Sequence, residues 1–247
     1  ESYLCDGRGQ NHLHSTRQSL PEKLQRRMLQ LLGGVFPCGL RSYRIGKSAS
    51  AACKLCGKME TPSHILCQCS SLHDIITASH DKIWRRLFEH LQGSLPNWLL
   101  FYDQPIGGMA LAELSAPLPG SVRRKKPDGV AQQSSQNECF LLEFTRTTDF
   151  WSTSLDAARV RKEDKEGYID MLDALRDRLP GWNVQLLTFV LGDRGLMDER
   201  LWRANLTKLG LAPPKQTAFL RMAQIGAYEV VDDILKVRAA LLHALHE

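Results

Sequence analysis

Two acidic residues stand beside short apolar runs in the second half of the chain. Asp128 follows Pro127 and precedes Gly129, and Glu143 lies inside the apolar run of residues 139–145. A carboxylate inside a buried strand is costly unless a cation or a hydrogen-bond donor offsets its charge. Two such acids on neighbouring strands would form a site for a hard divalent ion. In the alternative interpretation, Asp128 caps a turn after Pro127 and Glu143 pairs with a surface arginine.

A second set of candidate ligands is soft and closely spaced. It consists of Cys53, Cys56, His64 and Cys69, which flank a turn at Gly57. Three thiolates and one imidazole at this spacing can close a tetrahedral zinc shell. Too few apolar residues lie between them to form a core, so the metal would supply the folding free energy of this segment. Cys67 is the alternative fourth ligand, and a set of unpaired buried thiols is the alternative to a zinc site.

Composition places these residues in a globular chain. The 247 residues are 43% hydrophobic and include seven cysteines, four of them between residues 53 and 69. No apolar run approaches the ~20 residues that a membrane span needs, so we expect no membrane partner. Clustered rather than dispersed cysteines predict metal binding in a reducing, intracellular compartment. The chain begins with glutamate rather than methionine, so we expect it to be part of a longer protein.

Positive charge is concentrated at the front of the chain. Residues 1–60 contain ten Lys or Arg against four Asp or Glu, whereas the remainder contains 22 against 23. This surplus predicts contact with a polyanion at that end. Simple solubility is the alternative explanation.

Hydrophobic periodicity predicts an α/β arrangement in the second half. Helices are expected at residues 21–32, 79–92, 153–179, 198–209 and 214–245, and strands at 128–132, 138–145 and 184–191. Ser79 is expected to cap the second helix, with His80 in its first turn as a structural or capping residue. Lys162 and Lys165 fall on the apolar stripe of the 153–179 helix, where they either reach the site or extend outward to solvent.

The order Asp128, Glu143 and then a helical lysine resembles PD-(D/E)XK nucleases. Thr145 occupies the position where most of those enzymes carry the lysine. Together with the upstream Cys-Cys-His-Cys knuckle, the chain resembles the C-terminal region of site-specific non-LTR retrotransposon polyproteins with a restriction-like endonuclease. The Ser-His-Asp at residues 79–81 and the Leu-Gly-Asp-Arg-Gly at residues 191–195 are similar to that family as well.

The resemblance implies a restriction-endonuclease-like α/β core and a set of catalytic residues. In this family the lysine moves to the helix after the second acidic strand, with a tyrosine three residues on, which matches Lys165 and Tyr168. Asp128 and Glu143 would hold Mg²⁺ or Mn²⁺, and the knuckle would hold structural zinc. We expect Lys165 to point toward Glu143. We expect six basic residues to contact the DNA backbone, with loop solubility as the alternative for the run 123–126: Arg123, Arg124, Lys125, Lys126, Arg161 and Lys162.

The implied activity is nicking of target DNA in the nucleus. The cut would leave a 3′-hydroxyl that primes copying of the element RNA by a reverse transcriptase in the same polyprotein. The expected organisation is a helical segment with the knuckle at residues 1–93, a connecting segment at 94–119 and the nuclease domain at 120–247. Two alternatives remain: a nucleic-acid-binding module with a decayed nuclease site, and an unrelated zinc-stabilised scaffold.

Overall fold

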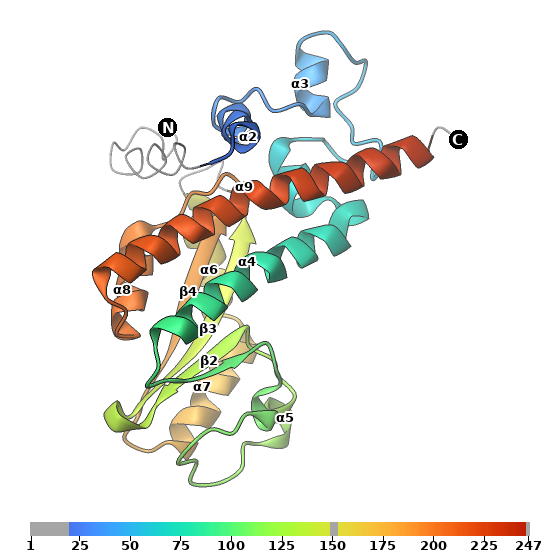
Figure 1. Ribbon diagram of the computed structural model, residues 1–247. Coiled ribbons are helices and arrows are strands. Elements are labelled where there is room, and N and C mark those ends of the chain that lie inside the picture. The colour runs from blue at the N-terminus through green and yellow to red at the C-terminus, as the bar shows by residue number, and fades with distance from the viewer. Residues whose placement is uncertain (1–19, 149–152, 246–247) are drawn as a thin grey trace.

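A four-stranded mixed sheet lies at the centre of the computed structural model, which describes residues 20–148 and 153–245. Its strands stand in the order β1 (Leu99–Tyr102), β2 (Gly129–Gln133), β3 (Glu138–Thr147) and β4 (Asn183–Gly192). The β1–β2 and β2–β3 pairs are antiparallel and β3–β4 is parallel. The predicted α/β class is therefore confirmed (Figure 1).

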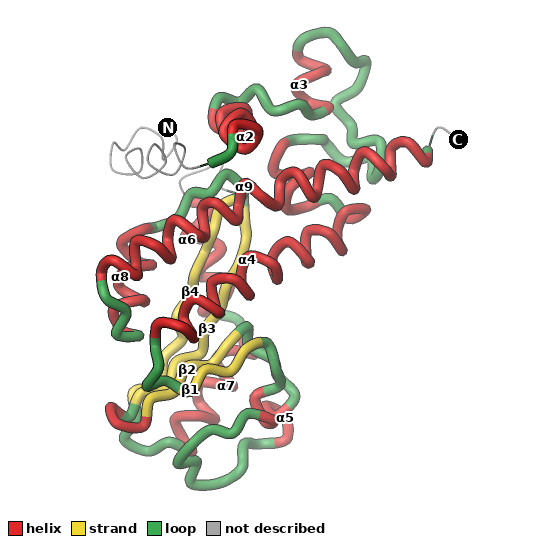
Figure 2. Tube along the Cα trace, in the orientation of Figure 1, coloured by secondary structure: helices red, strands yellow, loops and turns green. Residues whose placement is uncertain are grey.

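Three helices cover one face of the sheet. They are α4 (His73–Ser94), α8 (Glu199–Lys208) and α9 (Pro213–Ala244). The core on this side combines their apolar residues with alternate residues of β3 and β4, including Phe140, Phe144 and Phe189. Helices α4 and α9 lie side by side (Figures 1 and 2). At about 1.5 Å per residue, the 32-residue α9 is about 48 Å long, so it extends well beyond the sheet.

The opposite face carries α6 (Thr153–Glu163) and α7 (Glu166–Arg178), where the sequence predicted one helix at 153–179. The prediction of a single helix was wrong, because the extended backbone of Lys165, with ψ 118°, separates α6 from α7. A straight helix of that length would reach about 40 Å, more than the ~33 Å of a ten-residue strand. The break lets α6 pack near Val190 while α7 packs on the other end of the sheet, near Val184.

The segment before the sheet packs on the projecting part of α9. It contains α2 (Glu22–Leu32), α3 (Gly39–Arg44), the π-turn His64–Gln68 and the 3₁₀ turn Ser70–Leu72. Buried residues of this segment share a core with Tyr228, Val231 and Ile234 of α9. Further 3₁₀ turns at Ile106–Gly108 and Ser134–Gln136 and the short helix α5 (Gly120–Arg123) complete the described elements. Helix α9 thus contributes to two cores at once.

Most of the predicted elements are present with small shifts at their ends. Strand β1 was not predicted, and it lies inside the 94–119 segment that was expected to connect the two halves. Helix α4 begins at His73, six residues earlier than predicted, so Ser79 lies within it. The buried Ser79 hydroxyl donates to the carbonyl of Ile75 at 2.6 Å rather than capping a helix. Among the described helices, none has the length and apolar character required to cross a membrane.

Candidate functional site

The Cys-His cluster is assembled by tight local turns. Cys53 and Cys56 both lie in a short loop that is closed by the Ala52–Met59 bridge. Gly57 adopts φ +77°, a conformation that glycine reaches without strain, and its N–H donates to the carbonyl of Cys53 at 2.8 Å. The π-turn that follows carries His64 and leads directly to Cys69.

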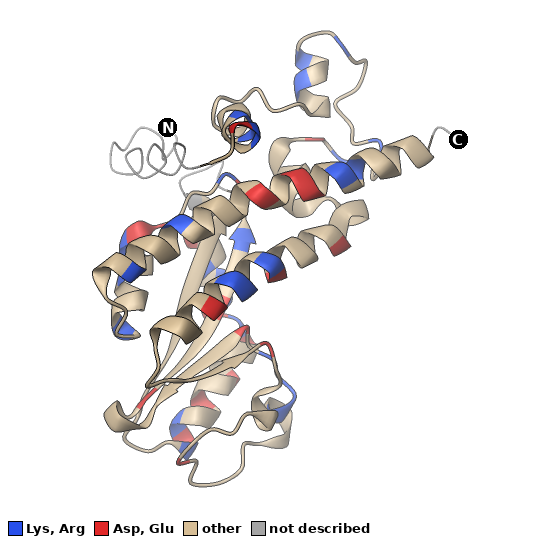
Figure 3. Ribbon diagram, viewed as in Figure 1, with Lys and Arg blue, Asp and Glu red and all other residues tan. Residues whose placement is uncertain are grey.

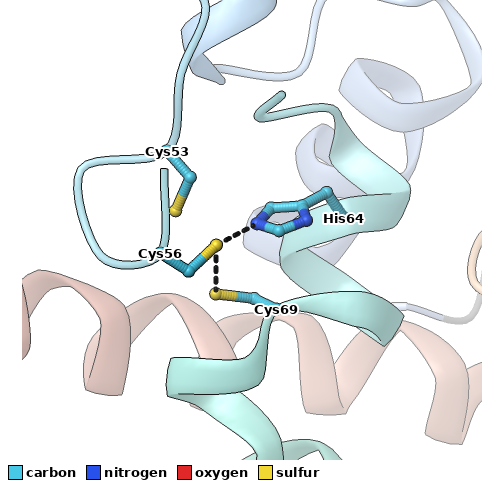
Figure 4. A group of neighbouring side chains, drawn as sticks. All are labelled: Cys53, Cys56, His64 and Cys69. Atoms are coloured by element: carbon cyan, nitrogen blue, oxygen red, sulfur yellow. Dashed lines mark hydrogen bonds between the residues drawn. The ribbon is translucent and has the colours of Figure 1, made fainter. Parts of the chain in front are cut away.

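All four predicted zinc ligands come together. Their ligating atoms lie within 4.8 Å of one another, with 3.2 Å between Cys56 Sγ and His64 Nε2 and 3.8 Å between the sulfurs of Cys56 and Cys69 (Figure 4). A tetrahedral zinc with bonds of about 2.3 Å separates two sulfurs by about 3.8 Å. The cluster therefore fits a metal such as zinc, with Cys69 rather than Cys67 in the fourth position.

The metal-free thiols differ in how readily they ionise. Burial raises the pKa of Cys53 to about 12 and also raises the pKa of Cys69. Burial opposes ionisation of Cys56 as well, yet the backbone of Lys58 and the neighbouring thiols lower its pKa overall. Because thiolates are the ligating form, a metal has to displace protons from at least two of these groups.

A buried ion pair fixes the knuckle segment to α9. Glu60, which is 3% exposed, accepts from Arg238 at 2.7 and 2.8 Å, and it also accepts from the N–H of Gly39. Charge-assisted hydrogen bonds from arginine to a carboxylate are among the strongest that side chains form. The position of the cluster relative to α9 is consequently fixed by charge as well as by packing.

The two candidate acids meet on the other half of the molecule. Gly129 of β2 pairs with Leu142 of β3 in antiparallel register, so one further step sets Asp128 opposite Glu143. Opposed residues of neighbouring strands point to the same face. The charge of Asp128 contributes to raising the pKa of Glu143, which agrees with the closeness of the two carboxyl groups.

Asp128 is held by the neighbouring strand and by α4. Its Oδ2 accepts from the N–H of Phe144 at 2.8 Å, and its carbonyl accepts from the indole N–H of Trp84 at 3.0 Å. Gly129 permits this close approach, since a Cβ there would lie 2.6 Å from the ring of Phe88. Asp128 keeps a side-chain exposure of 23%, so solvent and ligands reach it.

Glu143 is almost fully buried and has two partners. The hydroxyl of Tyr168 donates to Oε2, and the ammonium of Lys162 contacts Oε1. Burial, followed by the charge of Asp128, raises the pKa of Glu143 to about 8, although Lys162 acts in the opposite direction. Without a further cation, the site thus favours a protonated glutamate near neutral pH.

The two lysines differ from the expectation based on sequence. Lys162 lies near the end of α6 and contacts Glu143, whereas Lys165 is exposed and lies between the two helices, with its ammonium 5.5 Å from the centre of the Tyr168 ring. The expectation that Lys165 points toward Glu143 was wrong. It assumed one continuous helix, and the break at Lys165 changes the direction of every later side chain. Tyr168, by contrast, contacts Glu143 through its hydroxyl.

The other predicted DNA contacts vary in their surroundings. Arg123, Arg124 and Arg161 are exposed. Lys125 is paired with Asp170, and Lys126 lies 2.9 Å from Asp103. A phosphate would therefore have to compete with a carboxylate for either lysine, while the three arginines face solvent.

Two groups near the acids were not predicted. His80 of α4 places Nε2 2.9 Å from the carbonyl of Phe144 and 3.9 Å from Asp128 Oδ2. Glu163 accepts from Thr188 Oγ1 at 3.1 Å, and Thr188 is the β4 register partner of Glu143. The Ser-His-Asp motif drew attention to His80. About fifty residues separate it from Asp128, however, so nothing in the sequence indicated that the two lie close together. No sequence signal distinguished Glu163 from surface acids.

The chain was also compared with known proteins. No protein-family model matches it, and no curated protein matches it at a significant level.

Proposed function

We propose that this chain is a metal-dependent DNA endonuclease. The observation that carries the proposal is the meeting of Asp128 and Glu143 on one face of the sheet, with Lys162 and Tyr168 in contact with the second acid. Two carboxylates, a lysine and a phenol on consecutive elements suit hydrolysis of a phosphodiester. The resemblance of the motif order to PD-(D/E)XK nucleases agrees with this arrangement.

The donor set fits Mg²⁺ or Mn²⁺. Both candidate ligands are carboxylates, the oxygen donors that hard divalent cations prefer. Glu143 is 1% exposed and has a raised pKa, so the neighbouring groups of the protein do not fully stabilise its negative charge. When bound, the ion would supply Lewis acidity toward the phosphate and lower the pKa of the attacking water.

The protein's own residues then have defined tasks. Tyr168 and Lys162 fix the two oxygens of Glu143. The N–H of Phe144 orients Asp128. Lys162 is 31% exposed, so its ammonium can also meet a phosphate oxygen, where it would stabilise charge that develops in the transition state. In this proposal Lys162 replaces Lys165 as the catalytic lysine.

The knuckle is proposed to be a structural zinc site that contacts nucleic acid. Its four ligands leave no open position for substrate. Basic residues of the first sixty, such as Arg41 and Arg44 of α3, are available to contact phosphates near it (Figure 3). The wider role follows from the resemblance: nicking of target DNA in the nucleus, so that a linked reverse transcriptase copies the element RNA from the new 3′-hydroxyl.

Cleavage of supercoiled plasmid tests the activity. Wild-type protein with Mg²⁺ is expected to produce nicked circles, and EDTA is expected to prevent them. Asp128→Ala and Glu143→Ala should each abolish nicking and leave DNA affinity nearly unchanged, because phosphate contacts elsewhere supply most of the binding free energy. Glu138→Ala is the matched control, since Glu138 begins the same strand as Glu143. Normal nicking by either alanine variant of the acid pair would refute its assignment.

One observation favours a second candidate function. Thr145 stands where most PD-(D/E)XK nucleases have their lysine, as expected for a nucleic-acid-binding module whose nuclease site has decayed. That module would bind DNA with strong salt dependence and would not nick it. The same plasmid assay, with binding measured in parallel, separates the two functions.

A further inference from the structure

Helix α4 presents one continuous stripe to the acidic edge of the sheet. The residues at positions 80, 84 and 88 lie one turn apart on the same side of the helix. Phe88 packs against Gly129, and Trp84 donates to the carbonyl of Asp128 and stacks on Phe144 at 5.4 Å between ring centres. Trp84 and Phe88 are buried aromatic residues. His80, at the N-terminal end of the stripe, differs from them because it is polar and partly exposed.

The imidazole of His80 is oriented from three sides. Nε2 lies 2.9 Å from the carbonyl of Phe144 and 3.9 Å from Asp128 Oδ2, and both of these groups are acceptors. Nε2 must therefore carry a hydrogen and donate it. On the far side of the ring, Nδ1 lies 3.0 Å from Asp81 Oδ1, and the ring itself packs on Phe144 at 5.1 Å.

Phe144 thereby links His80 to the acid. Its N–H donates to Asp128 Oδ2 at 2.8 Å while its carbonyl accepts from His80. The same carboxylate oxygen is hydrogen-bonded to this N–H and lies 3.9 Å from His80 Nε2, so His80 acts on Asp128 mainly by fixing the Phe144 peptide. The exposed fraction of the His80 side chain, 26%, shows that it does not fill a core position.

We infer that His80 is a positioning residue for Asp128, which it holds in the orientation that binds a divalent cation beside Glu143. This inference rests on the proposed function, because the cation is the Mg²⁺ or Mn²⁺ that Asp128 and Glu143 are proposed to bind. It adds that α4, which begins four residues after the last knuckle ligand, supplies part of the nuclease site. Residues that orient a metal ligand typically affect metal affinity about 10- to 100-fold.

Two substitutions separate positioning from packing. His80→Leu keeps an apolar body over Phe144 and removes the N–H, whereas His80→Gln keeps an amide N–H near the place of Nε2. His73→Leu is the control, because His73 is an exposed histidine on the same helix. If His80→Leu does not fold, His80→Ala takes its place.

The primary measurement is Mn²⁺ binding to zinc-loaded protein in the absence of DNA, followed by electron paramagnetic resonance. The relevant site is the one that Asp128→Ala removes. We expect His80→Leu to weaken Mn²⁺ binding at that site about 10-fold or more, and His80→Gln and His73→Leu to stay within about 3-fold of wild type. The melting temperature and DNA affinity of all three variants should remain close to wild type.

The outcomes distinguish this inference from the proposed function. Unchanged Mn²⁺ affinity in His80→Leu, or an equal loss in His80→Gln, would overturn the positioning role even if plasmid nicking proceeds. The absence of any Mn²⁺ site that depends on Asp128 would overturn it as well. Conversely, a wild-type protein that does not nick but binds Mn²⁺ in a His80-dependent manner would refute the endonuclease activity and support the positioning role.

Discussion

Replacing Glu143 by glutamine tests the electrostatics of the acidic site without requiring any activity. Burial and the nearby Asp128 raise the pKa of Glu143 from 4.5 to about 8. When a carboxyl group has a higher pKa in the folded than in the unfolded protein, it costs no stability below the unfolded-state pKa. The free energy of unfolding then falls as the pH rises from the unfolded-state pKa toward the folded-state pKa. The protein without a divalent cation at the acidic site should therefore lose stability between about pH 4.5 and 8, and the glutamine variant should lack this loss.

The size of the effect follows from the same values. One pKa unit corresponds to about 1.4 kcal/mol, so the raised pKa costs the ionised folded state at most about 5 kcal/mol. Relaxation of the site and entry of water reduce that ceiling, and we expect about 2 kcal/mol. The advantage of Glu143→Gln over wild type in free energy of unfolding should thus grow by about 2 kcal/mol from about pH 5.5 to about pH 8.

Urea unfolding of zinc-loaded, magnesium-free protein at several pH values provides the assay. Comparing variants at each pH cancels the response of the knuckle, which is common to both proteins. Glu89→Gln is the control, because Glu89 is exposed on α4 and its substitution should have a small effect with little pH dependence. Addition of Mg²⁺ at about pH 8 should remove the advantage of Glu143→Gln by stabilising wild type alone. A stability difference that does not change with pH would refute the conclusion that Glu143 is buried without sufficient compensation for its charge.

Three further outcomes are expected. Purified protein should carry about one zinc per chain by metal analysis, and Cys53→Ser should lose it and the fold of the knuckle; protein prepared without chelator and found free of zinc would contradict this. In single-turnover nicking at saturating protein, Lys162→Ala should slow the reaction at least ~10²-fold and Lys165→Ala far less, and the reverse order would restore the assignment made from sequence. Arg238→Ala should lower the free energy of unfolding by about 3 kcal/mol, because it leaves the buried Glu60 carboxylate without its cationic partner. The control Lys236→Ala removes an exposed lysine and should cost under about 0.5 kcal/mol. Equal effects of the two substitutions in urea unfolding would rule out a special role for the buried pair.

Features that depend on short-range spacing could be predicted from the sequence alone. The knuckle ligands lie close together along the chain, so the Gly57 turn and the following helical turn suffice to bring them together. Strands β2, β3 and β4 were predictable because their apolar runs are dense and bounded by turn residues. The pairing of Asp128 with Glu143 followed from two adjacent strands joined by a short connection, where register is strongly restricted.

The tertiary structure decided which side chains complete the acidic site. The break at Lys165 arises because α6 and α7 pack against different parts of a sheet shorter than one continuous helix would be, and it leaves Lys162 rather than Lys165 in contact with Glu143. Strand β1 is a short apolar run inside a segment rich in glycine and proline, and it forms where it can pair with the edge of β2. His80 reaches Phe144 across 64 positions of sequence, and the close packing of α4 at Gly129 makes that contact possible. Such contacts depend on long-range packing, which residue periodicity does not encode.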